Sequence, residues 1–345
     1  MKNARYTAPV LVVWVTLAAC STPNGTMSSV ALPRAVAALN ASGNGHLYVA
    51  NAGGDTIAVY ALSGPSKRRT ISKGILSPLS LAFDRSGNLY VANCGGCFEP
   101  SQSSVTVYAA GTNAPSATIT DGVRDPTAVA FDSGGNLYVA NSVANDVTVY
   151  APGSTRVTRT ISKGVVAPAR LVFDAAGNLY VANGNDTVTV YGSGSRALKR
   201  TISDDVNSPY AMAFDRQGRL YVGNIPHKKH GKVEVYAADG KALVTTLDRD
   251  MRMPHALAFD AANELYVANW YYGGVTVFPA AKNDVLRTIT DGVDGPNALL
   301  FDPAGTLYVA NQFGNTVTVY APGASTPART ISGGMNEPYA LAFGP

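Results

Sequence analysis

The histidines of this chain are the side chains best suited to acid–base chemistry. Three of the four, His227, His230 and His255, lie outside the repeated phrases described below. Imidazole is the commonest general base in enzymes, so His255 is the candidate for that role. No nucleophile elbow, phosphate-binding loop or pair of catalytic carboxylates can be identified beside it. Catalysis is therefore only an alternative function, with its catalytic residues otherwise unknown.

The first cysteine indicates a modification site. Lys2 and Arg5 precede the apolar run Ala8–Ala19, which is too short to cross a bilayer and is typical of a signal peptide. The run ends in Leu17-Ala18-Ala19-Cys20, which resembles the lipobox of bacterial lipoproteins. The resemblance implies that residues 1–19 are removed, that Cys20 carries lipid, and that residues 20–32 form a tether. Because Ser rather than Asp follows the cysteine, it also implies the outer membrane, periplasmic or surface-exposed. An ordinary secretory signal that contains a cysteine is the alternative.

The other two cysteines form the pair Cys94-Gly95-Gly96-Cys97. Outside the cytoplasm a disulfide is the expected state of such a pair, which here would fasten a loop. A redox-active pair would need a βαβ context, and this pair lies between two expected strands. Free thiols or a bound metal stay open, although a structural zinc site would need a second ligand pair.

A repeated phrase dominates the rest of the sequence. LYVAN or LYVGN occurs seven times, ending at Asn51, Asn93, Asn141, Asn183, Asn224, Asn269 and Asn311. Each unit holds four short runs rich in Val, Thr, Tyr and Ile, separated by Gly, Asn, Asp or Pro. Four strands at this period predict one blade of a β-propeller. The 14% charged residues, 34 Gly and 20 Pro argue against a helical bundle, and a net charge of +4 is too small to indicate a nucleic-acid partner.

The longer unit, P-x-A-L-A-F-D-x-x-G-N-L-Y-V-A-N followed by N-T-V-T-V-Y, resembles YVTN-type and NHL-type propeller repeats. The resemblance covers residues 33–345. It implies an all-β, seven-bladed propeller of four-stranded antiparallel blades, and a binding platform, an adhesive surface module, or a lactonase or lyase. Pro338–Phe343 matches the first strand of a unit, so we expect this C-terminal strand to close the ring with residues 46–73. Residues 33–39 are the poorer alternative.

Recurrent polar residues are expected to belong to the scaffold. Asp84 and its five counterparts precede x-x-G-N or a near variant, which predicts a turn rather than a calcium site. Arg69 and four counterparts precede Thr-Ile on the outermost strand, where charge protects a sheet edge.

The residues that do not repeat predict the site. In a propeller, the loop between second and third strands shares one face with the start of the innermost strand. Ten unusual residues map to that face: Tyr210, His227, His230, His255, Trp270, Tyr271, Tyr272, Asn297, Phe313 and Tyr339. Clustered exposed aromatic residues indicate recognition, so we expect a site for a ligand or a protein. The alternative is that they only cap the core.

These observations predict a cell-envelope lipoprotein whose propeller is a binding or interaction module. We expect an unknown ligand or envelope protein as partner, no nucleic acid, contact with the membrane by the lipid anchor only, and a monomer. No cofactor or metal is expected. A metal-assisted lactonase or lyase is the first alternative and would require a divalent metal, for which only Asn297 matches the ligands of the related lactonases. A structural or adhesive surface protein is the second.

Overall fold

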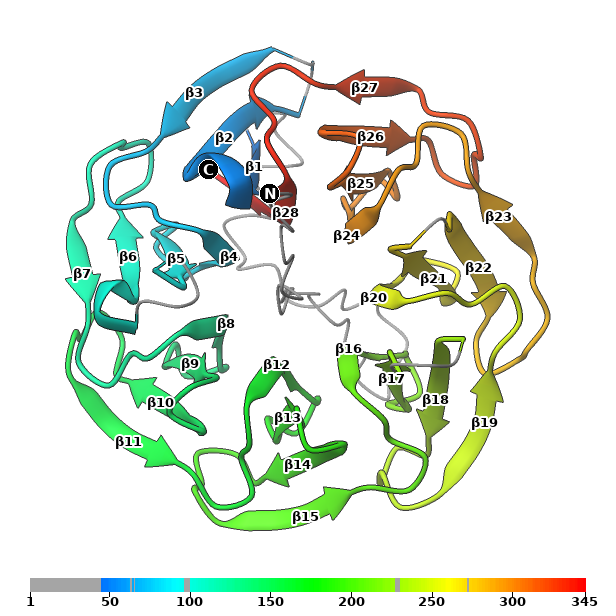
Figure 1. Cartoon of the computed structure of the whole chain (residues 1–345), viewed down its shortest axis with the longest axis horizontal. Coiled ribbons are helices and arrows are strands. Elements are labelled where there is room, and N and C mark those ends of the chain that lie inside the picture. The colour runs from blue at the N-terminus through cyan, green and yellow to red at the C-terminus, as the bar shows by residue number, and fades with distance from the viewer. Residues whose placement is uncertain (1–44, 63, 65, 96–99, 227–229, 272) are drawn as a thin grey trace, which may run out of the picture.

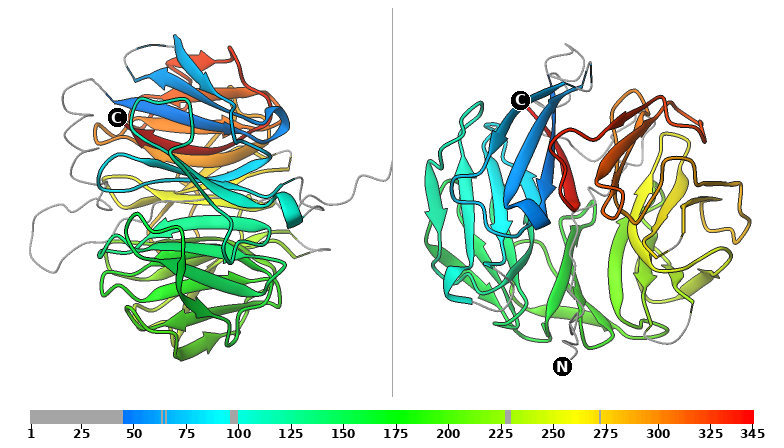
Figure 2. Two further views of the ribbon diagram at one scale, coloured as in Figure 1. Left: turned by 90° about the vertical axis from the view of Figure 1, so that its left-hand side faces the viewer. Right: turned by 45° about the horizontal axis from the view of Figure 1, so that its top comes forward.

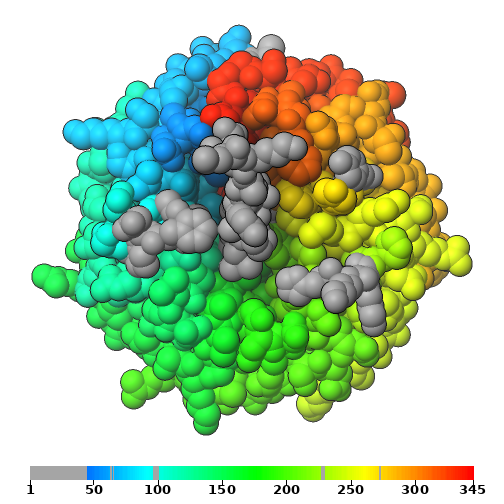
Figure 3. Space-filling model, viewed as in Figure 1, coloured from blue at the N-terminus to red at the C-terminus, as the bar shows by residue number. Residues whose placement is uncertain are grey.

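Seven four-stranded antiparallel sheets surround a central axis in the computed structural model (Figure 1). The structure describes residues 45–62, 64, 66–95, 100–226, 230–271 and 273–345. The ring is shorter along its axis than across it (Figure 2). In the space-filling view the blades follow one another around the axis in chain order (Figure 3). The expected seven-bladed β-propeller is therefore confirmed.

In each blade the four strands lie side by side, in order from the central axis to the rim of the ring (Figure 1). The innermost strands are β4 (Pro78–Phe83), β8 (Pro126–Phe131), β12 (Pro168–Phe173), β16 (Pro209–Phe214), β20 (Pro254–Phe259), β24 (Pro296–Phe301) and β28 (Pro338–Gly344). The second strands are β1 (His46–Asn51), β5 (Leu89–Asn93), β9 (Leu137–Asn141), β13 (Leu179–Asn183), β17 (Leu220–Asn224), β21 (Glu264–Asn269) and β25 (Leu307–Asn311).

The outer half of each blade is built in the same way. The third strands are β2 (Thr56–Ala61), β6 (Ser104–Tyr108), β10 (Asp146–Tyr150), β14 (Thr187–Tyr191), β18 (Lys232–Tyr236), β22 (Val275–Pro279) and β26 (Thr316–Tyr320). The outermost strands are β3 (Lys67–Ile71), β7 (Ala117–Ile119), β11 (Val157–Ile161), β15 (Leu198–Ile202), β19 (Leu243–Leu247), β23 (Arg287–Ile289) and β27 (Arg329–Ile331). Two 3₁₀ turns, η1 (Ala52–Gly54) and η2 (Pro100–Gln102), lie in loops between second and third strands.

The C-terminal strand closes the ring. β28 pairs with β1 to give the sheet order β28-β1-β2-β3, with Leu47 opposite Phe343. The Tyr48 hydroxyl donates a hydrogen bond of 2.7 Å to the Pro345 carbonyl oxygen. The expectation that Pro338–Phe343, rather than residues 33–39, completes the first blade is therefore confirmed, and the inner edge of β1 is paired.

The repeated aromatic residues join neighbouring blades. Each tyrosine of the LYVAN phrase meets the phenylalanine of the next blade edge to face, as in the Tyr48–Phe83 pair at 4.9 Å and the closing Tyr308–Phe343 pair at 5.2 Å. The tyrosine at the end of six third strands donates a hydrogen bond to the preceding blade, as Tyr108 does to the Lys73 carbonyl oxygen at 2.6 Å. These contacts repeat around the ring, so they belong to the scaffold.

The recurrent aspartates have the expected turn role. Asp84 Oδ1 accepts hydrogen bonds from the backbone N–H groups of Ser86 and Asn88, both at 2.9 Å. Asp132, Asp215, Asp260 and Asp302 do the same in their turns, and Asp174 Oδ1 accepts from the backbone N–H of Asn178. Asn88 is preceded by Gly87, whose φ of 79° suits a residue without a Cβ.

The outermost arginines do more than protect an edge. Arg69 Nη2 donates a hydrogen bond of 2.9 Å to the Tyr48 hydroxyl, and the guanidinium lies 5.8 Å from the centre of that ring. Arg159, Arg200 and Arg287 contact the matching tyrosines in the same way. Arg329 interacts with Tyr308 and also donates a hydrogen bond to the Leu62 carbonyl oxygen. The arginines that contact these tyrosines tie the outermost strand to the second strand. Protection of the sheet edge by their charge stays a prediction. Over the described residues, no helix is long and apolar enough to cross a membrane.

Candidate functional site

Strand register places the starts of the innermost strands beside the variable loops. Pro209 pairs with Asn224, Pro254 with Asn269 and Pro296 with Asn311, so each innermost strand begins where its second strand ends. The loops that hold η1 and η2 lie on this same end of the blades, which faces the viewer in Figure 1. This is the face on which the unusual residues were expected.

Five side chains from four consecutive blades contact one another in a row on this face and form what we call the ladder: Arg170, Tyr210, His255, Trp270 and Phe313. The Arg170 guanidinium lies 5.1 Å from the centre of the Tyr210 ring. The ring centres of Tyr210 and His255 are 4.4 Å apart, those of His255 and Trp270 are 4.8 Å apart and parallel to within 1°, and those of Trp270 and Phe313 are 4.9 Å apart. Residues distant in sequence therefore make one continuous contact.

Backbone geometry at the outer end of the ladder makes room for Phe313. Gly295, directly before β24, has a φ of 62°, and a Cβ at this position would lie 2.5 Å from the Phe313 ring. The equivalent residues of other blades, such as Ser77 and Ala167, carry a Cβ. The ring can lie over the start of β24 because this blade has glycine there.

A chain of hydrogen bonds links two rings of the ladder, His255 and Trp270, through Asn297 and Gln312. Gln312 Oε1 accepts hydrogen bonds from Trp270 Nε1 and from Asn297 Nδ2, both at 2.9 Å, and Asn297 Oδ1 lies 3.0 Å from His255 Nδ1. The indole N–H can only donate, which fixes the Gln312 and Asn297 amides in these orientations. His255 must then donate from Nδ1, so the neutral ring keeps its lone pair at Nε2.

Burial keeps His255 neutral. The side chain is 4% exposed, and burial lowers its pKa to about 3, against a smaller opposite effect of the Asn297 hydrogen bond. The Arg170 charge lowers the pKa further. His255 can therefore accept a proton or a hydrogen bond at Nε2 but carries no positive charge at neutral pH. Its role as a general base stays a prediction.

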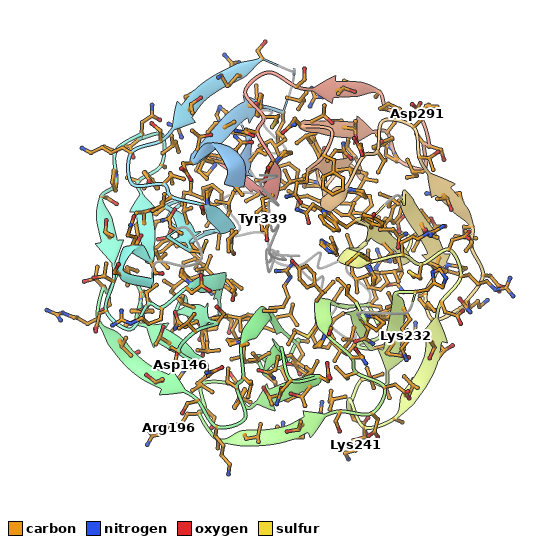
Figure 4. All side chains as sticks on the ribbon, in the orientation of Figure 1. Asp146, Arg196, Lys232, Lys241, Asp291 and Tyr339 are labelled. Carbon is orange, nitrogen blue, oxygen red and sulfur yellow. The ribbon has the colours of Figure 1, made fainter. Side chains whose placement is uncertain are left out.

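Arg170 is one of two site residues that the sequence did not lead us to expect. It is 1% exposed on β12, and burial lowers its pKa to about 9, partly offset by the nearby phenols of Tyr210 and Tyr339. Tyr339 lies beside the axis in Figure 4, and Tyr210 packs against the core cluster that contains it. The sequence does mark Arg170 as unusual. The second residue after the repeated proline is Ser80 or alanine in the other six blades. Gln312 was not expected at the site either, because its place in a variable loop is the only feature of the sequence that points to it.

The remaining expected residues have different positions. Tyr271 is 47% exposed beside Trp270, at 6.2 Å between ring centres, and Phe313 is 46% exposed. His230 is exposed and lies outside the ladder. His227, Tyr272, Cys20 and Cys97 lie outside the described residues, so the lipid at Cys20 and the Cys94–Cys97 disulfide stay predictions, although Cys94 is buried. We call the ladder together with Tyr271, Asn297, Gln312 and Tyr339 the axial site.

The acidic residues do not form a metal cluster in the part of the chain that the structure describes. No group of three or more His, Cys, Asp or Glu side chains there could hold a metal ion. The chemistry that the axial site offers is instead a buried cation, a neutral imidazole and aromatic surface.

Comparison with known proteins supports the fold. The chain is similar to hydrazine synthase of Kuenenia stuttgartiensis, with a TM-score of 0.67 and 18% identity over 81% of this chain and 92% of that chain. It is also similar to the computationally designed Ika8 protein, with a TM-score of 0.65 and 15% identity over 95% of this chain and 94% of that chain. No family model and no curated protein matches the sequence. At such identities the likeness shows the β-propeller fold alone, a fold that supports binding and interaction in general.

Proposed function

We propose that this chain is a cell-envelope lipoprotein whose β-propeller binds a ligand or an envelope protein at the axial site. One observation carries the binding proposal. Side chains at positions that do not repeat, from four neighbouring blades, assemble into a ladder of ring contacts and hydrogen bonds. A scaffold made of repeats needs no such assembly at only one part of its ring.

The exposure of the axial site fits recognition. Arg170 and His255 are buried, whereas Tyr271 and Phe313 are nearly half exposed. Exposed aromatic side chains held on a fixed base lose little conformational entropy when they bind, and such residues dominate binding energies in interfaces. Hydrogen bonds to Asn297 and Gln312 hold the neighbouring rings of His255 and Trp270 in one arrangement.

The envelope location is supported by the sequence. The signal-like segment 1–19 and the lipobox resemblance at Leu17–Cys20 favour a lipid anchor at Cys20, and the residue that follows favours the outer membrane. The repeats support membership of the YVTN-type or NHL-type propellers, which would make the partner an unidentified ligand or envelope protein.

Capture from an envelope extract tests the binding proposal. The immobilised parent protein should retain a partner or ligand, which mass spectrometry then identifies. The variants Trp270→Ala and Phe313→Ala should bind it with roughly 30-fold lower affinity. Leu286→Ala is the matched control, because Leu286 is 48% exposed and precedes β23 at the rim of the ring. Equal retention by all four proteins would refute binding at the axial site.

A further inference from the structure

Arg170 has two buried nitrogens that no group in the described part of the chain satisfies. Nη1 has a hydrogen bond of 3.4 Å to the Ala169 carbonyl oxygen, whereas Nε and Nη2 have no hydrogen-bond partner there. Nη1 is the nitrogen on the same side as Cδ, so Nε and Nη2 form the opposite edge of the planar guanidinium. This edge presents two parallel N–H groups, the geometry that binds both oxygens of a carboxylate.

The charge of Arg170 is also uncompensated by the described residues. None of the five ion pairs between them includes Arg170, and the groups that act on it electrostatically are the phenols of Tyr210 and Tyr339. A buried cation without a counter-ion is costly, so a bound anion would lower the free energy of the site. His255 beside it is neutral, so the site carries a single positive charge.

From this geometry we propose that Arg170 Nε and Nη2 bind the carboxylate of a small monoanionic ligand, whose flat apolar body contacts the rings of Tyr210 and Tyr339. The inference rests on the proposed function and names the ligand class of the axial site. One carboxylate balances one guanidinium, whereas a phosphate dianion would leave a buried negative charge. A planar apolar body suits neighbours that are themselves aromatic rings.

Phenylacetate and its uncharged analogue phenylacetamide test the proposal on the full-length protein. Isothermal titration calorimetry should show that phenylacetate binds at least about 10-fold more tightly than phenylacetamide, because hydrogen bonds to a charged group are the stronger ones. Arg170→Met should lose this difference. Arg170→Lys, which keeps the charge but not the two-pronged edge, should weaken phenylacetate binding as well. Arg196→Met is the matched control, since Arg196 is exposed and projects from the rim of the ring (Figure 4).

Stability without ligand separates a binding role from a structural one. If Arg170 is kept for an anion, Arg170→Met should melt at the same temperature as the parent or higher, because it removes a buried charge without a partner. A markedly lower melting temperature, phenylacetate binding that is unchanged in Arg170→Met, or no binding of phenylacetate to the parent would each overturn the anion site.

The outcomes also separate this inference from the proposed function. If Trp270→Ala loses the envelope partner while Arg170→Met keeps both that partner and phenylacetate, the axial site binds but Arg170 is not its anion contact. Suppose instead that Arg170→Met is the only variant that loses phenylacetate binding and that Trp270→Ala retains every envelope partner. The anion site is then supported, and recognition by the exposed aromatic residues is refuted.

Discussion

One residue of the axial site, His255, contributes to how the stability of the protein responds to acid. The pKa of His255 is lowered from 6.5 to about 3, so the unfolded chain takes up a proton in this range that the native protein does not. The stabilising effect is present above pH 6.5 and is lost as the pH falls toward 3, by up to about 1.4 kcal/mol of unfolding free energy per pH unit. Urea denaturation at several pH values should show that His255→Gln loses this part of the pH dependence.

His230 provides the control for that experiment. It is exposed and lies outside the ladder, so His230→Gln should keep the pH dependence of the parent. His46, whose pKa burial also lowers, contributes equally to all three proteins. Parallel stability curves for the parent and His255→Gln would mean that His255 is not held neutral.

At the scale of elements, β28 is the strand on which the ring depends. Removing residues 337–345 would strip Leu341 and Phe343 from the core, each worth about 1.5–3 kcal/mol when fully buried, and would expose the inner edge of β1. These losses are a large share of a net stability of about 5–15 kcal/mol. The truncated protein should melt at a much lower temperature or aggregate, as followed by circular dichroism.

A point substitution separates core packing from strand pairing in β28. Phe343→Ala keeps the backbone pairing with β1 and loses the Tyr308 contact, so it should cost about 3–5 kcal/mol and destabilise less than the deletion. A truncated protein with an unchanged melting curve would contradict closure by β28.

At the scale of the whole molecule, the proposed lipid anchor determines the cellular location of the axial site. Cys20→Ala should abolish labelling by a fatty-acid probe and leave the protein uncleaved or released from the membrane fraction, because two or more acyl chains are needed for stable anchoring. Cys94→Ala, at a cysteine outside the lipobox, should be labelled like the parent. Equal labelling of Cys20→Ala and the parent would end the lipoprotein proposal.

The sequence by itself determined the blades. Each strand and turn is encoded within about 45 residues, and seven copies of LYVAN or LYVGN reveal the period. The turn role of Asp84 and the position of the unusual residues on one face followed from the same repetition, because a residue's place in the unit fixes its place in the blade. Closure by Pro338–Phe343 followed as well, since that segment matches the unit better than residues 33–39.

Only the tertiary structure decided what the unusual residues do together. Tyr210, His255 and Trp270 were expected on one face, but their stacking depends on how closely the blades approach the axis, which no local pattern encodes. Arg170 stands out in sequence against Ser80 and the alanines, yet its burial and its two unsatisfied nitrogens exist only once the ring is closed. Side-chain contacts between blades are long-range, so the ring of seven blades, and not the repeat, creates the axial site.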